Sequence, residues 1–265
     1  MLATIDSTID ETPLIVSIED DVAFLTLNRP KQYNALSKAL LDALHQALED
    51  IADHKKIRVA VIASKGNAFC AGHDLKEMHG ANNAAFASEL FTQCATIMLQ
   101  ITRLPVPVIA EVQGMATAAG CQLVAQCDLA VAAEHAKFAV SGVNLGLFCS
   151  TPAVALSRTI SRKRAAEMLM TGEFIDAATA LNWGLVNRVV PAEALRNTTL
   201  ALCETLKAKP RGALATGKAL FYRQLELGME AAYADASATI ACNFADDDAQ
   251  EGVAAFLQKR KPDWD

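Results

Sequence analysis

The sequence has no excess of basic residues, no long apolar run and no visible leader, and each absence excludes a class of protein. Its 24 Lys and Arg face 30 Asp and Glu, which gives a net charge of -6. Without surplus cations to displace phosphate counterions, general nucleic-acid binding is not expected. No apolar run is long enough to span a bilayer. Residues 1–12 are polar and acidic, which predicts neither a signal peptide nor an Arg-rich transit peptide. We therefore expect a cytoplasmic protein without a membrane span.

The sequence also lacks CxxC pairs. Its seven cysteines are odd in number, and most of them lie within apolar runs. Both observations are typical of reduced, buried thiols in a reducing compartment. We expect no disulfide framework, no metal site and no resident cofactor.

What the sequence does contain is a large apolar fraction. The chain has 265 residues, of which 52% are hydrophobic and 20% are charged. A chain of this length and composition can bury a sizeable core as one large globular domain, with room for a smaller appendage.

Apolar runs alternate with helical patterns through the first part of the chain. The run at 59–63 is continuously apolar, as in a strand covered on both faces, and 108–112 is an extended run after two prolines. A small-residue turn follows each run. This alternation predicts an α/β layered core with crossover helices. The other expected elements are a hairpin at 14–18 and 22–27, a helix capped by Ser37 and running to 53, helices at 84–101 and 121–126, and strands at 128–133 and 138–140.

Beyond residue 161 the pattern is almost wholly helical. The expected helices lie at 162–170, 176–182, 193–207, 211–227 and 229–256, and one short strand lies at 185–190. We expect a core domain at 1–195 and a helical region at 196–265. Such Ala-rich helices need a partner surface on the core or on a neighbouring subunit.

Residues 67–78, N-A-F-C-A-G-H-D-L-K-E-M, combine the end of a strand with the start of a helix. Asp74, followed three positions later by Glu77, has the spacing of a capping box. The first amides of such a helix have no partner within it, and Gly72 lets a ligand oxygen approach them closely. Residues 113–120 repeat this arrangement. The stretch predicts either an ordinary strand-to-helix corner or half of an oxyanion hole.

Four groups of motifs follow one another along nearly the whole chain. They are L-N-R-P at 27–30 with N-A-L at 34–36, F-C-A-G-H-D-L-K-E-M at 69–78, G-M-A at 114–116 with G-C-Q-L at 120–123 and C-D at 127–128, and G-L-V at 184–186 with V-V-P at 189–191. In order and spacing they resemble the crotonase (enoyl-CoA hydratase/isomerase) family. Within it, the run at 142–152 is most similar to the group named enoyl-CoA hydratase domain-containing protein 3.

The resemblance implies an α/β fold built as a spiral of ββα turns, with a helical C-terminal trimerisation region. It also implies assembly as a trimer or a dimer of trimers, and a coenzyme A thioester as substrate or ligand. The family holds the thioester oxygen with two backbone amides, and the matching positions are His73 and Ala119. Fixed amides at helix starts suit this role, because enolate charge develops on that oxygen.

The same resemblance implies further ligand contacts. The segment that contains Ala71, His73, Asp74, Leu75 and Lys76 would line the adenine and pantetheine part of the ligand. The ligand phosphates would meet Arg29, Lys31 and Lys76, and also Lys259 from the same or a neighbouring subunit. The alternative for each of these is an ordinary solvated surface charge.

Two positions depart from the family's hydratases, which use two glutamates facing one water. Gln122 matches the first glutamate and Gly142 the second. Neither transfers a proton at neutral pH, so the usual hydration mechanism is not expected. Gln122 would instead orient a water or a substrate oxygen, or make a structural hydrogen bond. Candidates for a replacement acid, base or nucleophile are His73, Cys149, Ser150 and Glu111, each with a purely structural alternative.

These features leave three hypotheses. In the first, the protein is an acyl-CoA-handling enzyme that stabilises a thioester enolate without the hydratase acids. In the second, it is a non-catalytic acyl-CoA-binding or scaffolding protein. In the third, it performs other enolate chemistry such as decarboxylation, where loss of a substrate carboxylate supplies the electrons.

Overall fold

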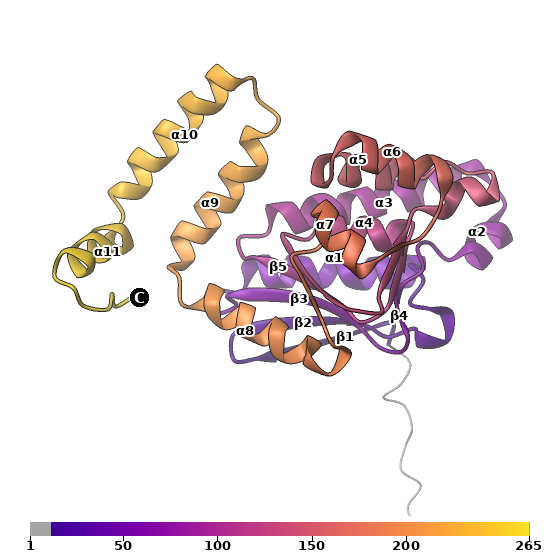
Figure 1. Cartoon of the computed structure of the whole chain (residues 1–265), viewed down its shortest axis with the longest axis horizontal. Helices are drawn as coiled ribbons and strands as arrows, with labels where there is room; N and C mark the ends of the chain where they lie inside the picture. The colour runs from indigo at the N-terminus through magenta and orange to yellow at the C-terminus, as the bar shows by residue number, and fades with distance from the viewer. Residues whose placement is uncertain (1–11, 265) are drawn as a thin grey trace, which may run out of the picture.

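The computed structural model describes residues 12–264. The prediction that residues 1–12 carry no targeting segment therefore falls, apart from Thr12, outside the described residues. Figure 1 shows an α/β core and an arm of helices that extends away from it.

A six-stranded sheet forms the centre of the core, with strand order β1-β2-β3-β5-β7-β10. The first two strands form the antiparallel hairpin that was predicted, and every later neighbour is parallel. β3 is buried at five of its six positions, which explains its unbroken apolar sequence. The strands are β1 (Leu14–Glu19), β2 (Val22–Leu27), β3 (Val59–Ser64), β5 (Val108–Val112), β7 (Leu129–Ala133) and β10 (Arg188–Val190).

A smaller sheet has the order β4-β6-β8-β9. Its strands are β4 (Ala68–Cys70), β6 (Met115–Thr117), β8 (Lys137–Ala139) and β9 (Ile175–Asp176). β3, β5 and β7 of the larger sheet are each followed by one strand of the smaller sheet and then by helical chain. This repeated ββα unit is the spiral that the sequence predicted.

Helices cover the sheets and continue into the arm. They are α1 (Lys38–Asp53), α2 (Leu75–Ala81), α3 (Ala84–Arg103), α4 (Ala119–Gln126), α5 (Ser150–Thr159), α6 (Arg162–Thr171), α7 (Ala177–Trp183), α8 (Leu195–Lys207), α9 (Arg211–Gln224), α10 (Met229–Phe244) and α11 (Asp247–Leu257), with 3-10 turns η2 (Pro30–Gln32), η3 (Ser141–Leu145) and η4 (Ala192–Ala194). Ser37 caps α1 as predicted, because its hydroxyl accepts the N–H of Leu40 at 3.3 Å.

Several element bounds differ from the expectations. The helix expected to begin at 121 begins at Ala119, directly after Ala118 has turned the chain with a φ of 49°. The helix expected at 229–256 is two helices, because the extended residue Asp246 separates α10 from α11, which begins at Asp247. The sequence analysis did not predict α5, and the strand expected at 185–190 is confined to Arg188–Val190.

Apolar side chains fill both faces of the six-stranded sheet. On one face, alternate residues such as Ile109 and Val131 pack with Leu202 and Cys203 of α8. On the other face, residues such as Ala110 pack with α1, α3, α4 and the smaller sheet. α8 lies beyond the expected boundary at 195/196 and still packs on the core; the division into 1–195 and 196–265 stays a prediction.

Six of the seven cysteines are buried, as predicted, and Cys242 on α10 is exposed. No helix within residues 12–264 is long and apolar enough to cross a membrane. In the same range, no group of three or more His, Cys, Asp or Glu side chains is arranged to hold a metal ion.

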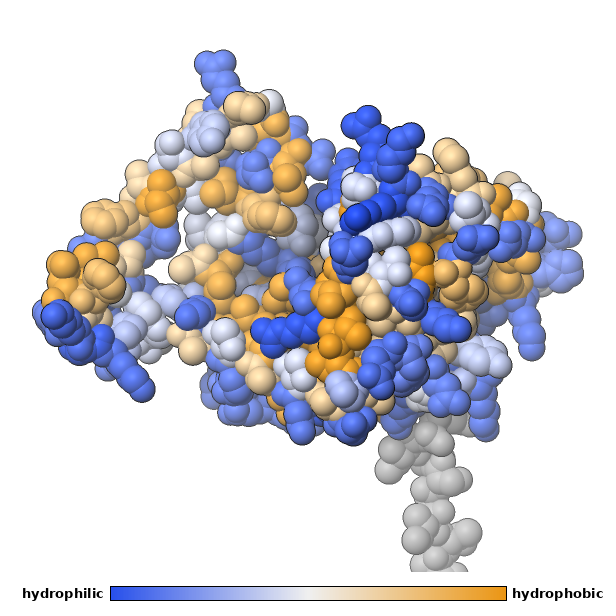
Figure 2. Space-filling view, in the orientation of Figure 1, coloured by the Kyte–Doolittle hydropathy of each residue, from blue (hydrophilic) through white to orange (hydrophobic). Residues whose placement is uncertain are grey.

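The arm consists of α9, α10 and α11 and is joined to the core by a buried ion pair. The Nζ of Lys218 on α9 lies 2.6 Å from the Oδ2 of Asp128, which immediately precedes β7. Farther out, large apolar side chains are exposed, including Tyr233 at 71% and Phe256 at 82%. Figure 2 shows apolar residues along this arm.

Candidate functional site

The two strand-to-helix turns that the sequence singled out lie against each other. β4 and β6 are parallel neighbours, so the turns that follow them leave the sheet side by side. At Gly72, with a φ of 91°, an added Cβ would lie 2.9 Å from the Cβ of Ala118 and 3.4 Å from the nitrogen of Ala119. At Gly120 an added Cβ would lie 2.1 Å from the carbonyl oxygen of Cys70. Both glycines are therefore needed for this close contact.

The turn after β4 directs the N–H of His73 away from Leu36, the residue that pairs with His73. Leu36 forms an isolated parallel bridge with His73: the N–H of Leu36 donates to Gly72 at 2.8 Å, and the N–H of Asp74 donates to Leu36 at 3.2 Å. In a parallel bridge the central residue points its own N–H to the opposite side. Among the described residues, no backbone oxygen accepts the N–H of His73.

The turn after β6 presents a second amide in the same way. Ala118 has a φ of 49° and a ψ of -119°, a conformation that costs a non-glycine residue of the order of 1–3 kcal/mol. Its N–H donates to the carbonyl of Ala139 at 2.9 Å, which holds it in place. Ala119 is then the first residue of α4, where a helix cannot satisfy the N–H. The described chain offers this N–H no backbone acceptor either.

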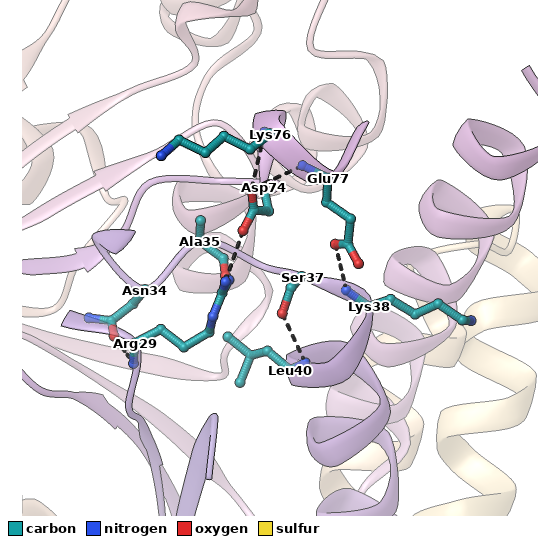
Figure 3. Close-up of polar contacts among 9 residues, drawn as sticks. All are labelled: Arg29, Asn34, Ala35, Ser37, Lys38, Leu40, Asp74, Lys76 and Glu77. Atoms are coloured by element: carbon teal, nitrogen blue, oxygen red, sulfur yellow. Dashed lines mark hydrogen bonds and ion pairs between the residues drawn. The ribbon is translucent and has the colours of Figure 1, made fainter. Parts of the chain in front are cut away.

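Asp74 caps α2, as predicted, but Glu77 does not complete a capping box. The Oδ1 of Asp74 accepts the N–H groups of Lys76 and Glu77 at 3.1 and 3.3 Å. The carboxylate of Glu77 turns instead to α1 and accepts the N–H of Lys38 at 2.9 Å. Figure 3 shows the two carboxylates serving the starts of two different helices. The capping-box prediction is wrong for Glu77, because a free N–H of α1 lies within its reach.

Arg29 connects the segment before α1 to the turn that contains Asp74. Its guanidinium lies 2.9 Å from the Oδ2 of Asp74 and donates to the carbonyl of Ala35 at 2.5 Å (Figure 3). Burial alone would raise the pKa of Asp74, but the Arg29 hydrogen bond and the helix N–H groups hold this pKa below its usual value. Arg29 thus has protein partners on both sides of its guanidinium. Its predicted contact with a ligand phosphate stays a prediction.

A cavity of about 380 Å³ opens where the two turns meet. Its size is within the range of ligand sites, roughly 300–1,000 Å³. The cavity is lined by Ala71, His73, Leu75, Met78, Phe91, Ala118, Ala119, Ser141, Gly142, Leu145, Leu147, Phe148, Cys149, Ser150, Thr151 and Pro152. Residues of both predicted turns therefore share one cavity with residues of η3 and α5.

The imidazole of His73 forms part of the cavity wall without a hydrogen bond. Its ring lies 5.1 Å from the ring of Phe91 in an edge-to-face arrangement. Neither ring nitrogen has a partner among the described residues. Burial lowers the pKa of His73 to about 4, so the ring is neutral at pH 7. A neutral, unpartnered imidazole can donate one hydrogen bond to a ligand and accept one from it, but with this lowered pKa it is a weak base.

Cys149 occupies the space that a side chain at position 142 would need. The N–H of Gly142 donates to the Sγ of Cys149 at 3.3 Å, and the N–H of Leu147 donates to the Gly142 carbonyl at 3.0 Å. An added Cβ at Gly142 would lie 2.8 Å from that sulfur and 2.9 Å from the carbonyl oxygen of Leu147. Burial raises the pKa of the Cys149 thiol above its usual value. The thiol is therefore protonated at neutral pH and is a poor nucleophile.

Gln122 lies on the first turn of α4, three residues after Ala119. It is 3% exposed, and its Oε1 has no hydrogen-bond partner within the described chain. It is not one of the residues that line the cavity. Of the four positions predicted as catalytic, the cavity lining thus includes His73, Ala119 and Gly142 and does not include Gln122.

Glu111 is wrong as a candidate for the replacement acid. It shares the strand face of Ile109, so its side chain lies on the α8 side of the sheet. Its Oε1 pairs with Arg196 at 3.1 Å. Burial raises its pKa, which Arg196 partly offsets. The cavity lies on the opposite face, because Ala119 and Cys149 belong to the cluster packed there.

The predicted phosphate-binding residues are spread over three places. Lys31, in η2, is exposed, and the Lys76 side chain extends away from the Arg29–Asp74 pair (Figure 3). Lys259 follows α11, the last helix of the arm, and does not line the cavity; Figure 1 shows α11 apart from the core. The described chain therefore does not bring Lys259 to its own cavity, and its predicted role is left to a neighbouring subunit.

The sequence analysis missed the apolar lining of the cavity. Phe91 comes from α3, Leu145 is the last residue of η3, and Leu147 and Phe148 follow η3. A local signal existed for the last three, because a cluster of large apolar residues follows Gly142 outside any regular strand or helix pattern. For Phe91 the signal is weak, since it lies within an ordinary amphipathic helix.

Comparison with known proteins gives three consistent results. The protein-family model described as enoyl-CoA hydratase/isomerase matches residues 17–265. The crystal structure of an enoyl-CoA hydratase of Mycobacterium smegmatis matches with a TM-score of 0.94 and 56% identity, covering 96% of this chain and 99% of that one. The crystal structure of human enoyl coenzyme A hydratase domain-containing protein 3 matches with a TM-score of 0.92 and 45% identity, covering 95% and 100%.

The sequence relatives agree with the structural ones. The chain is 46% identical over 246 residues to the Mus musculus protein named enoyl-CoA hydratase domain-containing protein 3, mitochondrial, covering 93% of this chain and 82% of that protein. The resemblance drawn from the motifs, including its similarity to the domain-containing protein 3 group, is thereby confirmed. The chain belongs to the enoyl-CoA hydratase/isomerase family.

Proposed function

We propose that the protein binds an acyl-CoA thioester with the thioester oxygen between the N–H groups of His73 and Ala119, and stabilises enolate charge there. The observation that carries this proposal is the contact of Gly72 with Ala118 and Ala119, since it places two amides without backbone acceptors at one cavity. Donors that are already fixed need no rearrangement when charge develops on a bound oxygen. A largely apolar cavity strengthens their effect, because little water competes for that oxygen.

Hydration of an enoyl thioester is not part of the proposed function. Gln122 and Gly142 stand at the two positions of the family's glutamates, and neither has a titratable side chain. The titratable groups that do line the cavity are His73 and Cys149. Burial lowers the pKa of the first and raises the pKa of the second, so both are neutral at pH 7. The described residues that line the cavity thus include no group suited to activate the attacking water.

The second candidate function is binding without turnover, in an acyl-CoA-binding or scaffolding protein. The lack of an acid or base with a pKa near 7 among the described cavity residues favours it. Decarboxylation needs no protein base, but it would place a substrate carboxylate beside a wall without a cation. The described cavity therefore supports decarboxylation less well than it supports binding.

The proposed assembly rests on the family resemblance, and the proposed location rests on the sequence. The exposed apolar side chains on α9, α10 and α11 suit contacts between subunits of a trimer or a dimer of trimers. In such an assembly, Lys259 of one subunit would reach the ligand phosphates of another, together with Lys31 and Lys76. A cytoplasmic location remains the prediction from the sequence, although the Mus musculus relative is named as mitochondrial.

A binding and turnover panel tests the proposal. Butyryl-CoA, hexanoyl-CoA and crotonyl-CoA are expected to bind more tightly than free coenzyme A, and crotonyl-CoA is expected to be hydrated no faster than in buffer. Consumption at about 1 per second or more would be typical of an enzyme and would contradict the absence of hydration. In a complex, the thioester oxygen should lie within about 3.2 Å of both amide nitrogens. An oxygen bound elsewhere would overturn the proposal.

A further inference from the structure

The wall of the cavity carries no charge at neutral pH. Within the described part of the chain, no Asp, Glu, Lys or Arg side chain lines it. Its titratable side chains, His73 and Cys149, are both neutral at pH 7 because burial disfavours their charged forms. The polar side chains that remain are the hydroxyls of Ser141, Ser150 and Thr151. The cavity therefore offers hydrogen bonds to a neutral group and no counter-ion to an anion.

Part of the same wall is apolar and uncovered. Leu145, Leu147 and Phe148 line the cavity, yet they are exposed by 62%, 51% and 54%. Large apolar side chains that face a ligand-sized cavity gain stability when an apolar group covers them. Together with Leu75, which is 51% exposed, they border the cavity on its open side. These four residues are suited to cover a hydrocarbon chain.

We infer that the cavity selects acyl-CoA thioesters whose acyl chain is uncharged and apolar, and rejects those whose chain ends in a carboxylate. This inference rests on the proposed function, which places the thioester oxygen at His73 and Ala119. A carboxylate carried into the cavity loses its water and meets no cation, and the cost of burying an unpaired charge is large. An uncharged chain of the same length loses no such hydration.

The test compares two thioesters with six acyl carbons, hexanoyl-CoA and adipoyl-CoA, with free coenzyme A as the baseline, by calorimetric titration at pH 7. We expect hexanoyl-CoA to bind at least about tenfold more tightly than adipoyl-CoA. Equal affinity of the two thioesters, both tighter than coenzyme A, would overturn the selection by charge and leave the proposed function intact. Equal affinity of all three would overturn the proposed function and this inference together.

A cation placed on the rim gives a second test. Leu145→Lys changes a side chain that is mostly exposed, so the fold should tolerate it, and it adds a positive charge beside the cavity. We expect the ratio of hexanoyl-CoA to adipoyl-CoA affinity to fall at least about threefold. Leu181→Lys, at an exposed position on α7 that does not line the cavity, is the matched control and should keep the wild-type ratio. An unchanged ratio in Leu145→Lys would contradict control of selection by the charge of the wall.

Discussion

The sulfur of Cys149 accepts the N–H of Gly142 at 3.3 Å and lies 2.8 Å from where a Cβ of residue 142 would stand. The position that matches the second hydratase glutamate is therefore filled by a neighbouring side chain. The family resemblance predicts a missing carboxylate at this position, but it does not predict which atom occupies the space. This pair explains why one substitution would not restore the family's acid.

Gly142→Glu is expected to destabilise the fold by about 1–3 kcal/mol, because the new side chain overpacks against Cys149 and the Leu147 carbonyl. Chemical unfolding in urea measures the change. Gly80→Glu is the matched control: an added Cβ at Gly80 meets nothing within 4 Å, so its stability should stay at or above that of the wild type. A Gly142→Glu variant as stable as Gly80→Glu would show that the Cys149 contact yields easily.

Making room for the carboxylates should produce the hydration that we expect the wild type not to catalyse. The triple variant Gln122→Glu, Gly142→Glu, Cys149→Gly has both family glutamates and no sulfur against position 142. We expect it to hydrate crotonyl-CoA measurably faster than the wild type, because proton transfer by placed carboxylates contributes roughly 10²–10⁴-fold. Gln122→Glu with Cys149→Gly is the control without the second acid. If the triple variant folds and binds crotonyl-CoA but matches this control, then the cavity does not hold the thioester where the family does.

The amide of Ala119 can be removed without removing a side chain contact to the ligand. Proline is tolerated at the first position of a helix, and a glycine at 118 accepts the positive φ that precedes it. Ala118→Gly with Ala119→Pro is therefore compared with Ala118→Gly alone. We expect the proline to weaken hexanoyl-CoA binding by about 1 kcal/mol, the net worth of one hydrogen bond. Any turnover should fall by roughly 10²–10³-fold.

The main difference between Ala118→Gly with Ala119→Pro and Ala118→Gly alone is the loss of the backbone N–H at position 119. Equal affinity and equal turnover in both would mean that the Ala119 N–H does not contact the thioester. Circular dichroism and urea unfolding of both variants exclude a general loss of structure. Weaker binding or slower turnover in the proline variant, whatever its size, would indicate that the Ala119 N–H contacts the thioester oxygen. No change would indicate an ordinary helix start.

Local features of the chain were predictable from the sequence because they depend on near neighbours. Ser37 and Asp74 cap helices through amides two or three residues away, and a continuous apolar run marked β3. Glu77 was misjudged for the opposite reason. Its partner, the N–H of Lys38, is far away in sequence, and only the folded chain brings it within 2.9 Å.

In the candidate site, too, some features could be predicted from the sequence and others depend on the folded chain. The glycine-containing turns and the positions of His73 and Ala119 could be named because the family motifs specify them. Which face of β5 carries the cavity could not be deduced from alternation alone, and so Glu111 was kept as a candidate although it faces Arg196. The contact between Gly142 and Cys149 depends on the path of η3, for which the sequence has no periodic pattern.

The ion pair that joins the arm to the core should matter far more than an exposed pair. Lys218 Nζ lies 2.6 Å from Asp128, donates to the carbonyls of Ile101 and Val106, and is 8% exposed. Tyr222 donates to the other Asp128 oxygen at 2.8 Å. Lys218→Met leaves a partly buried carboxylate without its cation, so we expect a loss towards the lower end of about 3–5 kcal/mol in unfolding free energy.

Arg158→Met is the matched control for Lys218→Met. The side chains of Arg158 and Glu226, which form an ion pair, are 57% and 65% exposed. Such exposed pairs contribute about 0–1 kcal/mol to stability. Urea unfolding monitors stability, and sedimentation monitors assembly, because a loosened α9 would misplace the exposed apolar side chains of the arm. If the two variants were equally stable, the cluster around Asp128 would not hold the arm in place.

Finally, His73 should make the folded state sensitive to acid. Burial lowers its pKa from 6.5 to about 4, so between these values the unfolded chain binds a proton that the folded chain does not. Stability is therefore complete above about pH 6.5 and falls as the pH decreases towards 4, by up to about 3 kcal/mol for a shift of about 2.5 units. His73→Gln removes this group, whereas His135→Gln removes an exposed imidazole that serves as control. Urea unfolding at pH 7 and pH 5 should show a smaller acid-induced loss in His73→Gln than in the wild type and His135→Gln. The same loss in all three proteins would mean that His73 is hydrated and titrates normally.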